Sequence, residues 1–455
     1  MEPALMVVGL NHRTASLSMR ERFWISDARR YEALRHLESA EGIEEVLILS
    51  TCCRTEFLVW ASEPTLAANS LVHYLSTQHG LRLSEWEHFY RRLDDDALTH
   101  IFRVASGLDS RPLCGSEVVS QLQVAWQQAR AMNATGPYLN AVLEKAFEVS
   151  ERVRREASSI ASTISIPEAT LDLASRVFGS VERRHVLLLG AAALSERAGR
   201  LMMGNGAASV VVIDESQARA QELADKLGCS AASFAERWTR LLKADIVISA
   251  SGCPHVIFTR EEAERIAAER NRVALLVIDI DMPRDVDPEV RRVDGILLYD
   301  IDGLERQFMS DHETAENLEE SSSAAAEAER IVAAEVAGFR GKLEAENALP
   351  TAVCLRRRLE QICRQELESF IEEQGPFTRE LVQCLHASVL QVSQKIANSL
   401  ARELKELPEK EQQEQMTAAV TRLFHLDSPN LALAGAKSKE ESDDSTRKHP
   451  IAINY

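Results

Sequence analysis

The sequence predicts a multidomain α/β protein with an α+β N-terminal domain, a doubly wound parallel-sheet domain and an all-α C-terminal domain. Strand-like and helical runs alternate at the start, and short apolar runs separated by helical segments follow. Beyond these, the strand signal disappears in favour of long helices rich in Ala and Glu. We expect domains over residues 1–156, 157–310 and 311–427, and a disordered tail over 428–455.

The N-terminal region carries strand-like runs at Ala4–Leu10, Val46–Leu49 and Phe57–Trp60, with helical runs between them. A helical pattern over Tyr138–Arg155 then leads into a loop rich in Ser and Ile. Pro167 opens the next helix, because a proline suits the first turn, where the backbone N–H has no partner within the helix.

The middle region predicts a Rossmann-like fold. Its strands are short, apolar, and β-branched or rich in leucine, as buried parallel strands are. Helical segments between them complete βαβ units, which assemble into a doubly wound sheet. The four expected strands are His185–Leu189, Ser209–Ile213, Ile246–Ser249 and Leu275–Ile278.

The C-terminal region is helical. The pattern predicts one long helix over Ala315–Leu343 and further helical segments from Pro350 to about Leu426. Such helices must bury their apolar stripes, and a second copy of the chain is the simplest partner, so we predict a homodimer.

Composition excludes some functions. A net charge of -18 over 455 residues argues against non-specific nucleic-acid binding, although a local basic patch can still hold a specific RNA. No apolar stretch is long enough to span a bilayer, and the start is no secretory signal. The eight cysteines lack disulfide or metal-ligand spacing. We predict a cytoplasmic protein with no metal site and no membrane partner.

One candidate site is the heptapeptide Ser50–Glu56, which follows an apolar run. A Cys at a strand end, two residues before an Arg, has surroundings that lower a thiol pKa and create a nucleophilic thiolate. Cys52 and Arg54 meet this description, and Arg54 could also hold a carboxylate in bidentate fashion. The heptapeptide alone fits a buried cysteine pair beside a surface ion pair of Arg54 equally well.

The second candidate site lies where a dinucleotide-binding fold carries G-x-G-x-x-G. Only the first glycine remains here, and an alanine at the second position adds a methyl group where the backbone should approach phosphate, which lowers cofactor affinity. Serine at the third position is a milder change, because that position mainly sets helix–strand packing. The predicted cofactor-binding residues are Gly190, Ala191, Ala192, Ala193, Leu194 and Ser195.

The following strand ends in Asp214 and Glu215. Both carboxylates would repel the 2′-phosphate of NADPH, whereas Asp214 can accept a hydrogen bond from a free ribose 2′-hydroxyl. We therefore predict a preference for NADH or weak binding of a nicotinamide dinucleotide. Arg219 is the basic residue that could compensate.

Five sequence blocks follow one another along the chain: Gly9–Ala15 with Arg20–Arg22, Ser50–Thr51–Cys52 with Arg54–Thr55–Glu56, Arg103–Ser110, Asp279–Ile280 with Pro283–Pro288, and Leu298–Asp300. In this order they resemble glutamyl-tRNA reductases, and the resemblance extends from about Val7 to Leu426. His100, ahead of the third block, matches a family position important for activity.

The resemblance implies a reaction. Cys52 as thiolate attacks the ester that joins glutamate to its tRNA and forms a thioester. NADPH, the family cofactor, then reduces the thioester to glutamate 1-semialdehyde in the first step of tetrapyrrole (porphyrin) biosynthesis. The implied partners are glutamyl-tRNA, a second subunit and a glutamate-1-semialdehyde aminotransferase.

The resemblance also assigns residues. His100 is expected to position groups or transfer a proton near the leaving ribose oxygen; the alternative is a histidine that faces solvent or is satisfied in the core. The residues expected to bind the glutamyl group are Thr51, Cys53, Arg54, Ser110 and Gln121.

Besides the glycine-poor loop and Asp214–Glu215, the chain departs from the family pattern at three further places. Cys53 stands where the family usually has Asn, and is either packing or an oxidisable neighbour of Cys52. Gly115 replaces a Glu of the substrate pocket, a space that Glu117 could reach from two residues on. The family's Leu-Leu-His block near the end is not recognisable.

Two hypotheses for the function remain: an active reductase, or a glutamyl-tRNA-binding paralogue with impaired or lost reductase activity. We favour the enzyme, because a thiolate site has no evident use in a passive binder. A small-molecule dehydrogenase of the shikimate type would leave both the N-terminal cysteine block and the long helical C-terminus unexplained.

Overall fold

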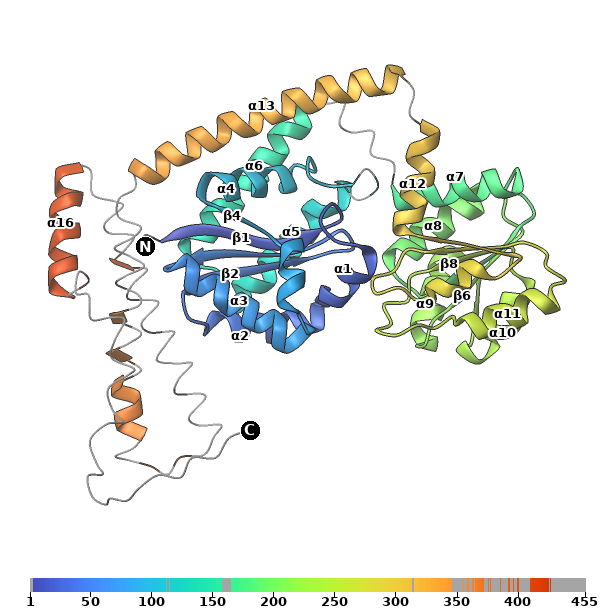
Figure 1. The fold of residues 1–455 in the computed structure, drawn as a ribbon, viewed down its shortest axis with the longest axis horizontal. Helices are drawn as coiled ribbons and strands as arrows, with labels where there is room; N and C mark the ends of the chain where they lie inside the picture. Colours follow the sequence, from blue (N-terminus) through green and yellow to red (C-terminus); the bar gives the residue numbers. More distant parts are fainter. Residues whose placement is uncertain are drawn as a thin grey trace, which may run out of the picture. The chain divides into compact units, whose positions relative to one another are not determined.

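The computed structural model describes residues 3–157 except 112 and 114, 165–312, 315–345, separate positions between 355 and 400, and 410–424 with 426. The chain divides into two compact units, Met1–Arg340 and Gly341–Tyr455. The described part of the first unit holds an N-terminal domain, a second domain built on a parallel sheet, and most of a long helix (Figure 1).

The N-terminal domain is built on a four-stranded antiparallel sheet in the order β2-β3-β1-β4. Nearly every residue of its first three strands is buried, so the sheet is covered on both faces. The three predicted strands are confirmed with longer bounds, whereas β4 has two exposed arginines and no apolar pattern to reveal it. The strands are β1 (Ala4–Asn11), β2 (Ile43–Ser50), β3 (Arg54–Ala61) and β4 (Tyr90–Leu93).

Helices cover this sheet, with α4 and α6 on one side of it and α2 and α3 on the other in Figure 1. Two of them begin at serine caps: the hydroxyls of Ser16 and Ser26 accept from backbone N–H groups of the first turns of α1 and α2. The elements are α1 (Leu17–Phe23), α2 (Asp27–Glu38), α3 (Pro64–His79), η1 (Leu83–His88), α4 (Asp94–Ala105), α5 (Gly115–Ala131) and α6 (Pro137–Glu156).

The second domain holds a six-stranded parallel sheet in the order β10-β9-β8-β5-β6-β7. The order reverses between β5 and β8, and in open α/β sheets a ligand crevice forms at the carboxyl ends of the strands at such a point. The predicted strands are confirmed; β7 and β10, which were not predicted, complete the sheet. Their bounds are β5 (His185–Leu189), β6 (Ser209–Ile213), β7 (Ser230–Ala232), β8 (Ile246–Ser249), β9 (Leu275–Asp279) and β10 (Ile296–Asp300).

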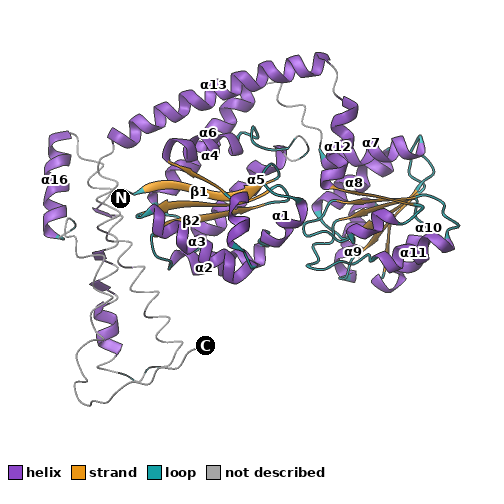
Figure 2. Ribbon diagram, in the orientation of Figure 1, coloured by secondary structure: helices purple, strands orange, loops and turns teal. Residues whose placement is uncertain are grey.

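Side chains alternate between the two faces of this sheet, so that Leu188 packs in one apolar cluster and Leu187 in the other. Helices α7, α8, α9 and α12 contribute to the first cluster, and α10, α11 and η4 to the second (Figure 2). As predicted, Pro167 lies in the first turn of α7, behind a Ser165 cap. These elements are α7 (Ile166–Phe178), α8 (Ala193–Gly204), α9 (Gln217–Leu227), η3 (Phe234–Glu236), α10 (Arg237–Lys243), α11 (Arg260–Glu269), η4 (Pro288–Arg292) and α12 (Ile301–His312).

The long helix is α13 (Ala315–Ala345), which confirms the helix predicted over Ala315–Leu343. Within the first unit it packs on the N-terminal domain, where Glu335 lies 2.7 Å from Lys145 Nζ and 2.6 Å from Arg152 Nη1. In the second unit, α16 spans Lys410–Leu423. Most of the helical region predicted beyond Pro350, and the tail predicted from Ser428 onward, fall outside the described residues.

Gly190 should be intolerant of any side chain. It directly follows β5 with φ +101°, and an added Cβ would lie 2.0 Å from the carbonyl oxygen of Ala250. We expect Gly190→Ala to lower stability by at least about 2 kcal/mol, since backbone must move. The matched control is Gly204→Ala in α8, whose Cβ would meet nothing within 4 Å. Calorimetry would contradict the close approach if both variants melted like wild type.

Candidate active site

Cys52 and Cys53 are the two central residues of the hairpin between β2 and β3. The backbone N–H of Thr51 donates to the carbonyl oxygen of Arg54 at 2.8 Å and closes the turn. The Thr51 hydroxyl accepts from the N–H groups of Cys53 and Arg54, each at 3.2 Å. Thr51 is 7% exposed, and its side chain stabilises the turn through these two hydrogen bonds.

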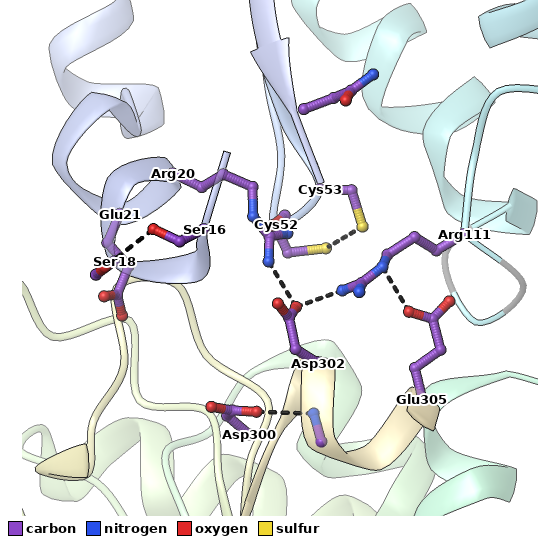
Figure 3. A network of polar contacts seen from close by, with 12 residues as sticks. Ser16, Ser18, Arg20, Glu21, Cys52, Cys53, Arg111, Asp300, Asp302 and Glu305 are labelled. Atoms are coloured by element: carbon purple, nitrogen blue, oxygen red, sulfur yellow. Dashed lines mark hydrogen bonds and ion pairs between the residues drawn. The ribbon is translucent and has the colours of Figure 1, made fainter. Parts of the chain in front are cut away.

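The two thiols of the hairpin differ in exposure. Cys52 is half-buried and Cys53 is 3% exposed; neither forms a disulfide, and their Sγ atoms lie 3.6 Å apart (Figure 3). Arg20 Nη1 donates to the carbonyl oxygen of Cys52 at 2.8 Å, and the N–H of His12 donates to that of Cys53 at 2.9 Å. Both carbonyl groups of the hairpin tip are thus anchored.

A buried polar network lies behind the hairpin. Arg54, 1% exposed, donates from Nη1 to Glu56 Oε1 at 2.8 Å and to Asp109 Oδ2 at 3.2 Å, and from Nη2 to the Asp109 carbonyl. Glu56 Oε1 also lies 2.9 Å from His100 Nε2 and accepts from the Tyr90 hydroxyl. Arg54 is therefore not in a surface ion pair, and His100, 3% exposed, does not face solvent.

The network stabilises the charged forms of Arg54 and Glu56. Burial alone would raise the pKa of Glu56, but Arg54, His100 and Tyr90 outweigh burial and hold that pKa well below its usual range. Burial would likewise lower the pKa of Arg54, and the neighbouring Glu56, Tyr90 and Asp109 raise it instead. Arg54 and Glu56 are therefore both ionised at neutral pH, and each holds the other side chain in place through their ion pair.

The other predicted glutamyl-binding residues are less uniformly placed. Ser110 follows Asp109, and its buried Oγ has no hydrogen-bond partner among the described residues. Gln121 is exposed on α5. Glu117 does not turn to the hairpin, because its carboxylate pairs with Arg197 of α8.

The predicted cofactor loop lies at the crevice of the parallel sheet. The N–H of Gly190 donates to the Ile213 carbonyl at 2.7 Å, and that of Ala191 donates to Asp214 Oδ2 at 2.9 Å. Ala192 is the N-cap of α8, so Ala193, Leu194 and Ser195 form its first turn, whose backbone N–H groups suit a phosphate.

A pocket at this crevice is lined by Gly190, Asp214, Glu215, Arg219 and Ser251, among others. Its position at the carboxyl ends of the strands, with backbone packed tightly at Gly190, fits a dinucleotide. Ser195 is fully buried in the first turn of α8, and its Oγ has no hydrogen-bond partner among the described residues.

The hairpin faces the nucleotide-binding domain. Cys53 belongs to the same apolar cluster as Met282, Ile301 and Leu304 of that domain. Ion pairs surround this contact: Arg20–Asp302 at 2.5 Å, Arg111–Glu305 at 2.5 Å and Arg284–Glu21 at 2.6 Å (Figure 3 shows the first two).

Several side chains around the hairpin had no role predicted from the sequence. Glu56 and Asp109 stood inside the blocks of family resemblance, which could have revealed them. Tyr90, Arg111 and Glu305 carry no local sequence signal, because only the folded chain brings them to the hairpin.

The described residues contain no helix long and apolar enough to cross a membrane. In the same part of the chain, no cluster of three or more His, Cys, Asp or Glu side chains could hold a metal ion.

Fold and site together define the class of protein: an oxidoreductase with a nicotinamide-dinucleotide domain and a thiol hairpin facing that domain. Family models match along the chain. Residues 8–157 match the glutamyl-tRNAGlu reductase N-terminal domain, 172–307 match shikimate/quinate 5-dehydrogenase, and 327–426 match the glutamyl-tRNAGlu reductase dimerisation domain.

Relatives match over nearly the whole length. The chain is 34% identical over 444 residues to glutamyl-tRNA reductase of Syntrophotalea carbinolica, covering 97% of this chain and 98% of the relative. It is 36% identical over 401 residues to that of Desulforudis audaxviator, covering 88% and 87%. The solved glutamyl-tRNA reductase of Methanopyrus kandleri matches at 24% identity and TM-score 0.44, covering 93% and 99%. The chain belongs to the glutamyl-tRNA reductase family.

Glu56→Gln should be strongly destabilising, because it leaves buried Arg54 with one carboxylate fewer. Breaking a buried ion pair costs about 3–5 kcal/mol. The folded pKa of Glu56 lies below its unfolded value of about 4.3, so this stability is present above that pH and is lost as pH falls below it. Calorimetry at pH 7 and at lower pH measures both effects.

The control for this prediction is Glu222→Gln, which removes one partner of an exposed pair with Lys226 and should change the melting temperature little. Equal melting temperatures for the two variants at pH 7 would contradict the importance of the buried pair.

Proposed function

We propose that this chain reduces glutamyl-tRNA to glutamate 1-semialdehyde, the first step of tetrapyrrole biosynthesis, with Cys52 as nucleophile. The observation that carries the proposal is the position of Cys52: it lies half-buried at a hairpin tip that a charged network supports and that faces the nucleotide-binding domain. Nothing in the comparisons favours a paralogue that only binds the tRNA.

In the first step the Cys52 thiolate attacks the ester carbonyl carbon, an S–C bond forms, and the ribose oxygen leaves and takes a proton. His100 is our candidate for handling that proton. Its Nε2 is fixed by Glu56 and its Nδ1 lies 3.8 Å from Asp109 Oδ2, so the ring orientation is set from both sides.

In the second step a bound reduced nicotinamide supplies the hydride that converts the thioester to the aldehyde. The chain's part is to hold the dinucleotide at Gly190–Ser195 and to keep water from the reacting carbon. Packing of Cys53 and Leu113 against the nucleotide-binding domain supports such exclusion.

Recognition of the glutamyl group is proposed for Thr51, Cys53, Arg54, Ser110 and Gln121. Arg54 Nη1 and Nη2 are already engaged by Glu56 and Asp109. Arg13, 57% exposed, lies 3.0 Å from the other oxygen of Asp109. A substrate carboxylate that displaced Asp109 would therefore meet two guanidinium groups, Arg54 from within and Arg13 from the solvent side.

We propose NADH rather than the family's NADPH. Asp214 and Glu215 line the pocket with one basic residue, Arg219, whose Nη2 lies 3.4 Å from Asp214. The local charge is therefore negative, which opposes a 2′-phosphate. Although Oδ2 of Asp214 is engaged by Ala191 and Arg219, Oδ1 accepts from Ser216 and has a further lone pair for a ribose hydroxyl.

Partners follow from the same proposal. Residues 327–426 match a dimerisation domain, which supports the predicted homodimer. We retain the predicted cytoplasmic location and the aminotransferase as recipient of the aldehyde, because a free aldehyde is reactive and is best handed directly to the next enzyme.

A single-turnover assay with labelled glutamyl-tRNA tests the activity. We expect wild type to form glutamate semialdehyde and Cys52→Ser to form none, since an alcohol at this position is a far weaker nucleophile. Cys53→Ser is the matched control, one residue away in the same turn. It should still form product at a reduced rate, because the nucleophile remains while one proposed glutamyl contact is altered. Equal product from Cys52→Ser and wild type would remove the mechanism; wild type that forms none but binds the tRNA would indicate the paralogue.

Titration of both dinucleotides tests the cofactor proposal. We expect wild type to bind NADH more tightly, and Glu215→Gln to bind NADPH several-fold better because one repelling carboxylate is gone. Arg219→Gln is the converse control and should weaken NADPH binding. Tighter binding of NADPH than of NADH by wild type would overturn the preference.

A further inference from the structure

We propose that Glu305 is the proton donor of the reductive step, delivering a proton to the Cys52 sulfur as the aldehyde is released. This inference rests on the proposed function. It adds a catalytic residue from the nucleotide-binding domain to a site otherwise built from the N-terminal domain.

The geometry places Glu305 beside the thiol hairpin. The residue lies on α12, the helix that follows the last strand of the parallel sheet, and Asp302 precedes it by one helical turn (Figure 3). Arg111, from the loop before α5, lies 2.5 Å from Glu305 Oε2 and also pairs with Asp302. Asp302 in turn pairs with Arg20, which donates to the Cys52 carbonyl.

One carboxyl oxygen of Glu305 is buried and makes no hydrogen bond to the described residues. The residue is 6% exposed, and its buried Oε1 has no hydrogen-bond partner among the described residues. A buried oxygen without a partner is costly in a protein interior. Such an atom is suited to carry a proton that a reacting group will take.

The pKa values of the two carboxyl groups of α12 are shifted in opposite directions. Burial, helped by Cys53 and Asp302 and opposed by Arg111 and Arg20, raises the pKa of Glu305 to about 7. For Asp302, burial is outweighed by Arg20 and Arg111, and the pKa falls below its usual value. Neighbouring carboxyls with separated pKa values are a common way to assign an acid and an electrostatic stabiliser.

This proton assists the second step, because sulfur leaves more readily as a thiol than as a thiolate, and the thiol returns the proton to solvent before it attacks again as a thiolate. Hydride transfer to the thioester carbon leaves a hemithioacetal alkoxide; its C–S bond then breaks, the electron pair goes to sulfur, and the C=O bond forms again. The sulfur takes the proton from Glu305, which solvent later reprotonates. The balance is thioester, NAD(P)H and one proton to aldehyde, thiol and NAD(P)⁺.

The other titratable groups near the hairpin are less suited to this task. His100 is tied to Glu56 in the network behind the turn. Burial lowers the pKa of His12 to about 4, so this imidazole carries no acidic proton at neutral pH. A guanidinium group is not deprotonated in proteins, so the neighbouring arginines are excluded as proton donors.

The experiment separates the two steps. Enzyme and labelled glutamyl-tRNA are mixed without dinucleotide to form the thioester, and NADH or NADPH is then added at several pH values. For Glu305→Gln we expect thioester to form at the wild-type rate and its reduction to slow by about a hundredfold or more. The fall in the wild-type reduction rate above pH 7, where Glu305 loses its proton, should disappear in this variant.

Asp302→Asn is the matched control, since it removes the other carboxylate of α12. It should retain the fall in rate, moved to lower pH because the negative charge of Asp302 helps to raise the pKa of Glu305. Glu305→Asp should restore part of the reduction rate. Unchanged reduction and pH profile in Glu305→Gln would overturn the proposal, as would equal slowing of both steps, which indicates a structural role.

A measurement that needs neither tRNA nor dinucleotide accompanies this test. Removing the Glu305 carboxylate should shift the pH profile of Cys53 alkylation, followed by peptide mass spectrometry, to lower pH, because a negative neighbour is lost. An unshifted profile would overturn the proposed proximity. Wild type that forms no thioester would defeat the proposed function, and the alkylation profile would still decide the placement of Glu305.

Discussion

The buried pair of Arg54 and Glu56 is the interaction on which the active site depends. A guanidinium group at 1% exposure is tolerable only when carboxylates and a carbonyl surround it, and Glu56 and Asp109 supply them. The same pair orients His100 through Glu56. Asp109 also lies 3.0 Å from the exposed Arg13, so this pair connects the hairpin, the histidine and a solvent-side arginine.

A second constraint is the docking of the nucleotide-binding domain against the hairpin. Cys53 and Leu113 share an apolar cluster with α12, and the ion pairs of Arg20 and Arg111 with Asp302 and Glu305 border it. Apolar contact supplies non-directional attraction, whereas the ion pairs fix orientation. A thioester on Cys52 would therefore form next to the domain that must deliver the hydride.

Much of this could be predicted from the sequence. Strand periodicity and the spacing of βαβ units gave the parallel sheet, and the Cys52 block pointed to the thiol site, because both signals are local. Local patterns could not show that Glu117 pairs with Arg197, or that Tyr90 and Glu305 reach the hairpin. Those contacts join residues far apart in sequence, and β4, with its exposed arginines, carries no apolar alternation.

The most direct test of the central claim, covalent catalysis by Cys52, is to find the acyl group. Wild type is mixed with glutamyl-tRNA in the absence of dinucleotide, quenched in acid and digested, and the peptide spanning both hairpin cysteines is fragmented in a mass spectrometer. We expect a glutamyl adduct on Cys52 that hydroxylamine removes, as it does thioesters. An adduct on Cys53 instead, or no adduct on a preparation that forms aldehyde once dinucleotide is added, would contradict the mechanism.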